Sequence, residues 1–195
     1  MALRSTITAG LSLALTALQL GCASQRPCSY NPATESDRNP AEAERLNQQA
    51  TAIIDSDPTT AEALLRRALA ADLYYAPAHN NLGTLLLKQG KLYEAAGEFE
   101  WAKKLMPGHP DPRLNLALTL ETAGRTDEAI ATYQTALEVY PEHIATMQAL
   151  TRLQVRSGRT DDRTRPMLSE VALRGESKQW RDWARLQVER TEASK

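Results

Sequence analysis

The pattern of apolar and small residues in the middle of this chain recurs every 34 positions. The first copy, between residues 76 and 109, consists of Leu82, Gly83, Ala95, Phe99, Ala102 and Pro107. The second, between residues 110 and 143, consists of Leu116, Ala117, Ala129, Tyr133, Ala136 and Pro141. A period of this length is typical of proteins built from stacked supersecondary units, each of which buries its apolar face against its neighbours.

Each residue type in the pattern has a physical reason. Gly83 and Ala95 have almost no side chain, so two antiparallel helices can approach closely there, and Phe99 fills the space between them. Gly90 can take a positive φ and so allows a tight turn between the helices. Pro107 has no N–H to donate and therefore ends the second helix.

Weaker copies flank these two. Residues 42–75 carry Ala61, Leu65 and Ala68 in register, and Asn47, Asn81 and Asn115 occupy one repeat position. Residues 144–175 begin with a regular first helix that carries Leu150 and Val155 and ends at Gly158. Their second half is degenerate, because Arg163 and Glu170 stand where small residues belong.

This pattern resembles the tetratricopeptide repeat (TPR), a helix–turn–helix unit of about 34 residues. The resemblance implies an all-α fold, a right-handed α-solenoid of about four repeats with a C-terminal capping helix. The expected TPR domain covers residues 41–175, with repeats at 42–75, 76–109, 110–143 and a degenerate one at 144–175. Residues 176–195 are expected to form the capping helix and tail, because the last repeat of a solenoid exposes an apolar face.

The N-terminus predicts an export signal over residues 1–21. One positive charge, Arg4, precedes an uncharged run from Ser5 to Leu20 and then small residues. The run is short and rich in Ser, Thr and Gly for a membrane span, which needs about 20 apolar residues. The ending at Cys22 resembles a bacterial lipoprotein box, which implies lipidation of Cys22, although Gln19 stands where the box usually has Leu. A plainly cleaved signal and a retained anchor are the alternatives.

Location follows from the same resemblance. Ala23 after the cysteine implies an outer-membrane protein facing the periplasm, where the source has two membranes. Residues 22–40 contain three prolines and almost nothing apolar, so we expect a flexible tether. If Cys22 is acylated, Cys28 has no partner within the chain; it is either an exposed thiol or the site of an intermolecular disulfide.

Composition excludes several classes of function. The formal net charge is −1, which gives no field favouring nucleic acid. The basic residues between Arg152 and Arg165 are interrupted by Asp161 and Asp162, so we expect a solvated surface there. There is no cysteine–histidine spacing for zinc, no glycine-rich phosphate loop and no nucleophile elbow. We therefore predict no enzyme activity, no metal, no cofactor and no small-molecule substrate.

The three histidines fit the same interpretation. His109 and His143 are 34 residues apart, so they occupy equivalent loop positions on successive repeats, too far apart to share one metal. We expect them, with His79, to be repeat-end residues without a chemical role.

The remaining class of function is binding, and the repeat pattern predicts which residues form the binding surface. TPR arrays line a concave groove with the first helix of each repeat. The predicted groove residues are Ala50, Ile53 and Ile54; Asn80, Thr84, Leu87 and Lys88; Leu114, Leu118 and Glu121; and Gln148, Arg152 and Arg156. This groove runs from apolar to basic, which favours an apolar or amphipathic partner segment with an acidic flank. The alternative is that the apolar positions, Leu114 and Ile54 above all, only pack helices together.

Some TPR adaptors clamp a peptide's terminal carboxylate with paired Lys and Asn. Asn81 and Asn115 match the family's asparagine positions, but the lysines of the clamp are absent, so we predict no such clamp. Trp180 and Trp183 are expected to pack inside the capping helix. We expect Trp101 to pack against a neighbouring repeat, and to be a contact candidate if it is partly exposed.

The sequence thus predicts a non-enzymatic adaptor or assembly factor, held in the cell envelope by a lipid, with a protein or peptide partner. Two alternatives remain open. One is a structural protein that forms homo-oligomers. The other is an accessory subunit of an envelope enzyme or of a pilus or secretion assembly.

Overall fold

A computed structural model describes residues 38–193 of the chain, and every regular element in that range is an α-helix. The helices are α1 (Pro40–Ile53), α2 (Pro58–Ala71), α3 (Ala76–Lys88), α4 (Leu92–Leu105), α5 (Asp111–Thr122), α6 (Thr126–Val139), α7 (Ile144–Ser157), α8 (Thr164–Arg174) and α9 (Lys178–Ala193). None of these helices is both long and apolar enough to span a bilayer. The expected signal peptide, Cys22, Cys28 and the tether up to residue 37 lie outside the described residues.

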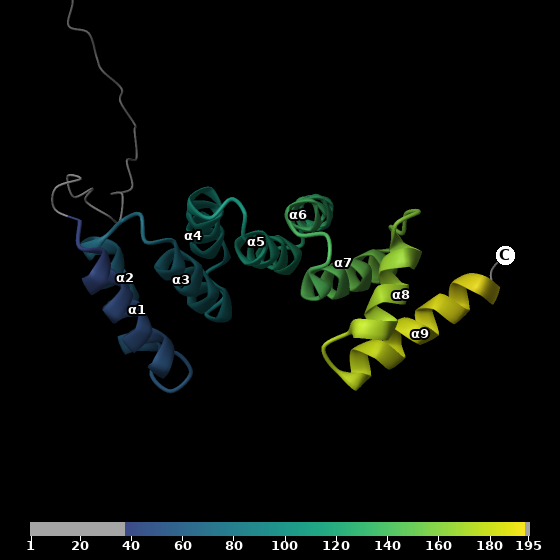
Figure 1. Ribbon diagram of the computed structural model, residues 1–195, viewed down its shortest axis with the longest axis horizontal. Coiled ribbons are helices and arrows are strands. Elements are labelled where there is room, and N and C mark those ends of the chain that lie inside the picture. The colour runs from purple at the N-terminus through teal and green to yellow at the C-terminus, as the bar shows by residue number, and fades with distance from the viewer. Residues whose placement is uncertain (1–37, 194–195) are drawn as a thin grey trace, which may run out of the picture.

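Consecutive helices pair as hairpins that stack side by side, which is the predicted α-solenoid (Figure 1). The first helices of the four repeats begin at Pro40, Ala76, Asp111 and Ile144. These starts lie within two residues of the predicted repeat boundaries at 42, 76, 110 and 144. In Figure 1 the stack forms an arch, with α3, α5 and α7 along its inner side and α4 and α6 along its outer side.

Local chemistry sets the ends of the helices. The Asp57 carboxylate accepts a hydrogen bond from the Thr60 backbone N–H at 3.0 Å and so caps α2, whose first residue is Pro58. The turn between the helices of repeats two, three and four contains a glycine with φ of 74°, 77° and 68°, at Gly90, Gly124 and Gly158. Such angles are unfavourable for residues with a Cβ, which explains why glycine recurs there.

The repeat signature forms the core. Ten of its residues are buried: Leu82, Gly83, Ala95, Phe99, Ala102, Leu116, Ala117, Ala129, Tyr133 and Ala136. Pro107 and Pro141 are exposed and follow directly after the C-caps of α4 and α6. One continuous core runs from α1 to α7, and a second, smaller core joins α7 and α8 to α9.

Repeat four ends differently from the others. Its second helix, α8, has 11 residues where α2, α4 and α6 have 14. Leu168 and Val171 of α8 are buried with Ala184 of α9, so the capping helix covers the apolar face that the last repeat would otherwise expose.

One expectation about repeat two is wrong. His79 is not a loop residue: it lies in α3, is 0% exposed, and contacts Glu98 Oε2 through Nδ1 and the Leu73 carbonyl through Nε2, at 2.7 and 2.8 Å. Trp101 stacks on His79 of its own repeat, with ring centroids 5.5 Å apart, and is 40% exposed, the partial exposure that makes it a contact candidate.

The close approach at Gly83 gives a stability prediction. A Cβ at this position would lie 2.7 Å from Cε1 of Phe99, which is fully buried, so the ring or one of the two helices would have to shift. Gly83→Leu should therefore lower the free energy of unfolding by about 1–3 kcal/mol, measured as the urea midpoint at an unchanged slope.

Gly97 in α4 is the matched control, because a Cβ there would have no neighbour within 4 Å. Gly97→Ala should stabilise the protein by about 0.5–1 kcal/mol, since glycine inside a helix is entropically costly. Equal midpoints for the two variants would contradict the assigned packing.

Candidate functional site

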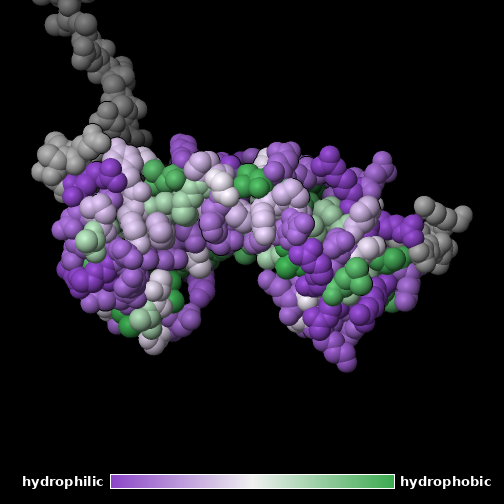
Figure 2. All heavy atoms as spheres, in the orientation of Figure 1, coloured by the Kyte–Doolittle hydropathy of each residue, from purple (hydrophilic) through white to green (hydrophobic). Residues whose placement is uncertain are grey.

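The candidate site is the concave face, which we define as the inner surface of α1, α3, α5 and α7. Figure 2 shows that the molecular surface is hollowed along its lower edge, between the N-terminal and C-terminal halves of the arch. The predicted groove residues of the described chain all lie on these four helices or directly after α1.

The middle of this face is tied together by amide side chains. Asn81 Nδ2 donates to Asn47 Oδ1 at 2.8 Å, and Asn115 Nδ2 donates to Asn80 Oδ1 at 3.0 Å. The Thr84 hydroxyl donates to the backbone carbonyl of Asn80 at 2.9 Å. These bonds join α1 to α3 and α3 to α5, so part of the polar surface predicted to meet a partner also fixes the spacing of the repeats.

The apolar positions divide into two kinds. Ala50 is fully buried, so it lines no groove. Ile53, Ile54, Leu87 and Leu114 are partly buried and pack against the main core, so each contributes both to packing and to surface.

The remaining positions of α3 and α5 are less constrained. Leu118 of α5 is partly buried. Lys88 is exposed, and its Nζ lies 2.8 Å from Oδ1 of Asp55 in the turn after α1, an ion pair of the kind that adds little stability.

The basic end of the face is organised by one carboxylate. The Glu121 side chain is 7% exposed, and its Oε1 accepts from Nη2 of Arg156 at 2.8 Å and from Nη2 of Arg152 at 3.2 Å. Its Oε2 accepts from the hydroxyl of Tyr133 at 2.9 Å. We call Glu121, Tyr133, Arg152 and Arg156 the arginine cluster. One negative charge faces two positive ones, so the cluster as a whole is cationic.

Two tryptophans of α9 extend this end. The guanidinium carbon of Arg152 lies 5.9 Å from the ring centroid of Trp180, within the range of cation–π attraction. Trp180 and Trp183 meet edge to face with centroids 5.5 Å apart. With Gln179 and Arg152 they line a cavity of about 320 Å³. Trp183 packs against the C-terminal core as expected, whereas Trp180 does not belong to that core; both rings line the cavity.

Gln148 needs a correction as a groove residue. It is 3% exposed, its Nε2 donates to Glu176 at 2.9 Å, and its Oε1 accepts from the Glu176 backbone N–H at 2.8 Å. Both ends of the amide hold the α8–α9 loop against α7, so Gln148 positions the capping helix and is not available to a partner.

His109 and His143 also lie closer to each other than the repeat pattern predicts. Oδ2 of Asp111 is 3.6 Å from Nδ1 of His109, and its Oδ1 is 3.5 Å from Nε2 of His143, so both rings flank one carboxylate. Among residues 38–193, no group of three or more His, Cys, Asp or Glu side chains has the geometry to hold a metal ion.

Sequence reasoning missed the part that α9 plays. The pattern places Glu121, Arg152 and Arg156 on the concave face, but it treats Trp180 as core, because α9 lies outside the 34-residue frame. The contact between Glu121 and Tyr133 could have been anticipated, since the tyrosine replaces a phenylalanine and a buried hydroxyl needs an acceptor.

Tyr133 supplies a pH-dependent test of the cluster. Burial, together with the charge of Glu121 and its hydrogen bond to the phenol, holds the pKa of Tyr133 well above its usual value of about 10. Above about pH 10 the unfolded chain releases this proton and the folded chain keeps it, so stability falls by about 1.4 kcal/mol per pH unit from this group.

Tyr133→Phe should therefore be less stable than the wild type by about 1 kcal/mol at pH 7, where it lacks one hydrogen bond. The difference in free energy of unfolding between the wild type and this variant should shrink to zero and then change sign as the pH rises above 10. Chemical denaturation from pH 7 to 11 measures it. A constant difference over this range would show that the phenol is not buried beside the Glu121 carboxylate with a raised pKa.

Comparison with known proteins agrees with this geometry. Residues 94–153 match the family model described as a tetratricopeptide repeat. Tetratricopeptide repeat protein 8 of Mus musculus is 26% identical over 98 residues, which are 50% of this chain and 19% of that protein. The chain therefore matches only about a fifth of this curated relative.

Solved structures extend the similarity to most of the described chain. The first TPR domain of Spaghetti (RPAP3), bound to the HSP90 peptide SRMEEVD, superposes with a TM-score of 0.59 at 15% identity, over 63% of this chain and 98% of that one. A TPR protein from Parabacteroides merdae superposes with a TM-score of 0.64 at 22% identity, over 79% of this chain and 61% of that one. MamA from Desulfovibrio magneticus gives 0.59 at 20% identity, over 76% of each chain. The chain thus carries a TPR sequence match over residues 94–153 and has the fold of TPR α-solenoids.

Proposed function

We propose that this protein is a non-enzymatic adaptor that binds a segment of a partner protein on its concave face. The observation that carries the proposal is the arginine cluster. Glu121 is nearly buried and holds two arginines at the surface, where the side chains of Arg152 and Arg156 are 41% and 60% exposed. Each has N–H donors beyond the one that Glu121 accepts, so the cluster offers a fixed cationic site for a carboxylate.

The chemistry of the partner follows from the order of groups along the face. Leu87, Leu114 and Leu118 offer partly exposed apolar surface before the arginines begin. A partner segment with apolar residues followed by an acidic one matches this order, with the acidic side chain beside Arg156 and Trp180 available for an apolar contact.

The HSP90 peptide in the RPAP3 structure shows that this fold can bind an acidic peptide. The clamp that some TPR adaptors use for a terminal carboxylate needs lysines that this sequence lacks. We therefore propose that an internal acidic side chain, and not a chain terminus, is recognised here.

Peptide selection tests the concave face directly. The full chain would be used to select binders from a random-peptide phage library, and their affinity measured for the wild type and two variants. Arg156→Ala should weaken binding at least about tenfold, which corresponds to about 1.4 kcal/mol, and leaves the pair between Arg152 and Glu121 in place.

Arg125→Ala is the matched control. Arg125 is 55% exposed and paired with Glu128, much as Arg156 is 60% exposed and paired with Glu121, but it lies at the start of α6, off the concave face. Binding should survive this change, and the peptide SRMEEVD should bind far more weakly than the selected peptides. Selected peptides that bind both variants equally, or a selection without acidic peptides, would refute the proposal.

We also propose that the adaptor is anchored in the cell envelope through a lipid on Cys22, where it faces the periplasm of a two-membrane cell. The support is the sequence Leu20-Gly21-Cys22 behind an uncharged run. An anchor of this kind would hold the protein at a membrane while residues 23–37 separate the solenoid from its surface. The pathway of the partner, whether an envelope enzyme or a pilus or secretion assembly, would then be an envelope process.

Metabolic labelling tests the anchor. The wild type expressed in a bacterium should incorporate radiolabelled palmitate and partition with membranes, and Cys22→Ser should do neither. Cys28→Ser, which changes the only other cysteine, should retain the label. Label that depends on Cys28, or that is absent from the wild type, would exclude lipidation at Cys22.

Self-association is a second candidate function. Leu173 and Leu186, near the C-terminal end of the solenoid, are 73% and 44% exposed, and Trp101 is 40% exposed. Apolar side chains at such exposure favour a protein contact. Light scattering over a range of concentrations separates a defined oligomer from a monomeric adaptor.

A further inference from the structure

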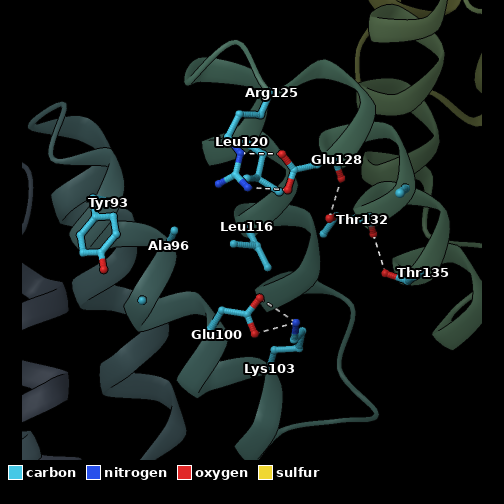
Figure 3. A pocket seen from close by; sticks show the side chains of 12 residues that line it. Tyr93, Ala96, Glu100, Lys103, Leu116, Leu120, Arg125, Glu128, Thr132 and Thr135 are labelled. Carbon is cyan, nitrogen blue, oxygen red and sulfur yellow. Dashed lines mark hydrogen bonds and ion pairs between the residues drawn. The ribbon is translucent and has the colours of Figure 1, made fainter.

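A second groove lies on the outer side of the arch, between α4 and α6. It has a volume of about 540 Å³. Its floor is formed by Leu116 and Leu120 of α5, and its α4 wall includes Ala96 and Gly97 (Figure 3). We call it the α4/α6 groove. It is separate from the concave face and does not depend on the function proposed for that face.

The preceding groove of the solenoid, between α2 and α4, is bridged by the chain itself. Glu62 of α2 accepts from Nε2 of Gln89 at 3.1 Å and lies 3.5 Å from Nζ of Lys91. One turn later, Arg66 pairs with Glu62 at 2.8 Å and lies 3.9 Å from Glu94 of α4. A glutamate and an arginine spaced four residues apart on α2 therefore bridge to the start of α4.

This bridge is missing one repeat later, although half of it is retained. Thirty-four residues after Lys91 and Glu94 stand Arg125 and Glu128, so a basic and an acidic residue are kept at these positions. Thirty-four residues after Glu62 and Arg66 stand Ala96 and Glu100, so the glutamate and arginine that form the bridge are lost.

The retained charges are satisfied locally. Nε of Arg125 donates to Oε1 of Glu128 at 2.6 Å within α6, and Glu100 pairs with Lys103 at 2.7 Å within α4. Figure 3 shows these two pairs at opposite ends of the groove, with Leu116 between them. Within residues 38–193 no ion pair between α4 and α6 crosses the groove, and a Cβ at position 97 would meet no atom within 4 Å.

We propose that the α4/α6 groove is a docking site for a partner helix that carries a glutamate and an arginine four residues apart beside leucines. The partner's glutamate would pair with Arg125 and its arginine with Glu128, as Glu62 and Arg66 do with Lys91 and Glu94. Its leucines would lie against the exposed ring of Tyr93 and the small residues of the α4 wall, above the buried Leu116 and Leu120. The charge complementarity is thus the one that the chain already uses in the preceding groove.

Arg125 and Glu128 can leave each other and pair with a partner helix at little energetic cost. The side chains of Arg125 and Glu128 are 55% and 56% exposed, and a solvent-exposed pair of this kind contributes at most about 1 kcal/mol. Opening it therefore costs little, whereas a partner helix would cover the side chain of Tyr93, which is 84% exposed, together with the small residues of the α4 wall, and would exclude water there. The apolar contact would supply affinity, and the two ion pairs would fix the register and direction of the helix.

The chain itself supplies the probe. A helix-stapled peptide with the sequence of residues 58–71 carries Glu62 and Arg66 with Leu65 and Leu69 on the adjoining face, at the spacing that places them together on a helix. Its binding to the full chain would be measured by fluorescence anisotropy. We expect saturable binding.

The decisive protein variant is Ala96→Glu/Glu100→Arg, which installs in repeat two the pair that bridges the preceding groove. It should weaken peptide binding at least tenfold and leave the melting temperature unchanged or higher. The site from which the peptide sequence is taken is unaltered in this variant, so the loss would place binding in the α4/α6 groove. Equal binding to the variant, or no saturable binding to the wild type, would overturn the proposal.

Charge exchange adds a test that misfolding cannot imitate. A peptide in which the glutamate and arginine are exchanged should bind the wild type at least tenfold more weakly. Arg125→Glu/Glu128→Arg should bind this exchanged peptide better than the original one. Arg156→Ala on the concave face should leave all these affinities unchanged, so failure of this proposal and failure of the concave-face proposal are distinguishable. Loss of peptide preference in the exchanged protein would show that the ion pairs do not direct binding.

Discussion

The contact between an aromatic ring and a position with little or no side chain on the facing helix determines this architecture. In repeat two the ring is Phe99 and the facing residue is Gly83, with no room for a Cβ between them. This contact fixes how closely the two helices of a hairpin approach, and that distance sets the position of every residue on their outer surfaces. Because the contact recurs after 34 residues, the hairpins have similar shapes and stack into one curved array.

The second copy of that contact links the core to the candidate site. Tyr133 takes the place of Phe99 and is equally buried, but it carries a hydroxyl that must be satisfied. Glu121 accepts from that hydroxyl and also from Arg152 and Arg156. A carboxylate that is 7% exposed is costly unless it is paired, so the two arginines and the phenol stabilise one another's positions. The cationic end of the concave face is therefore anchored to the core through Glu121 and Tyr133.

The sequence predicts those features that recur with the 34-residue period and fails where a contact has no copy in another repeat. The buried signature residues follow from the period alone, because small and aromatic positions must face each other in every hairpin. Gln148 occupies a groove position by its number, yet α9 brings Glu176 against it, and α9 has no counterpart earlier in the chain. His79 and Trp101 stack because both occur in one repeat, and neither has a copy 34 residues away that could reveal their contact. Asn80 could be placed on the concave face from the period, but its bond to Asn115 joins positions that are 35 residues apart and so lies outside the simple register.

Divergence between repeats is informative for the same reason. A solenoid can satisfy its own grooves, as Glu62 and Arg66 do between α2 and α4, and a groove closed in this way offers little to a partner. Replacement of those two residues by Ala96 and Glu100 removes the bridge but leaves the fold intact, because the positions are on the surface and not in the core. The charges that remain turn to neighbours on their own helix, Arg125 to Glu128 and Lys103 to Glu100, so the opened groove carries no unpaired charge. In a repeat protein, a surface position that departs from its copy while the core positions are kept can therefore change binding with little effect on stability, as Ala96 and Glu100 do in the α4/α6 groove.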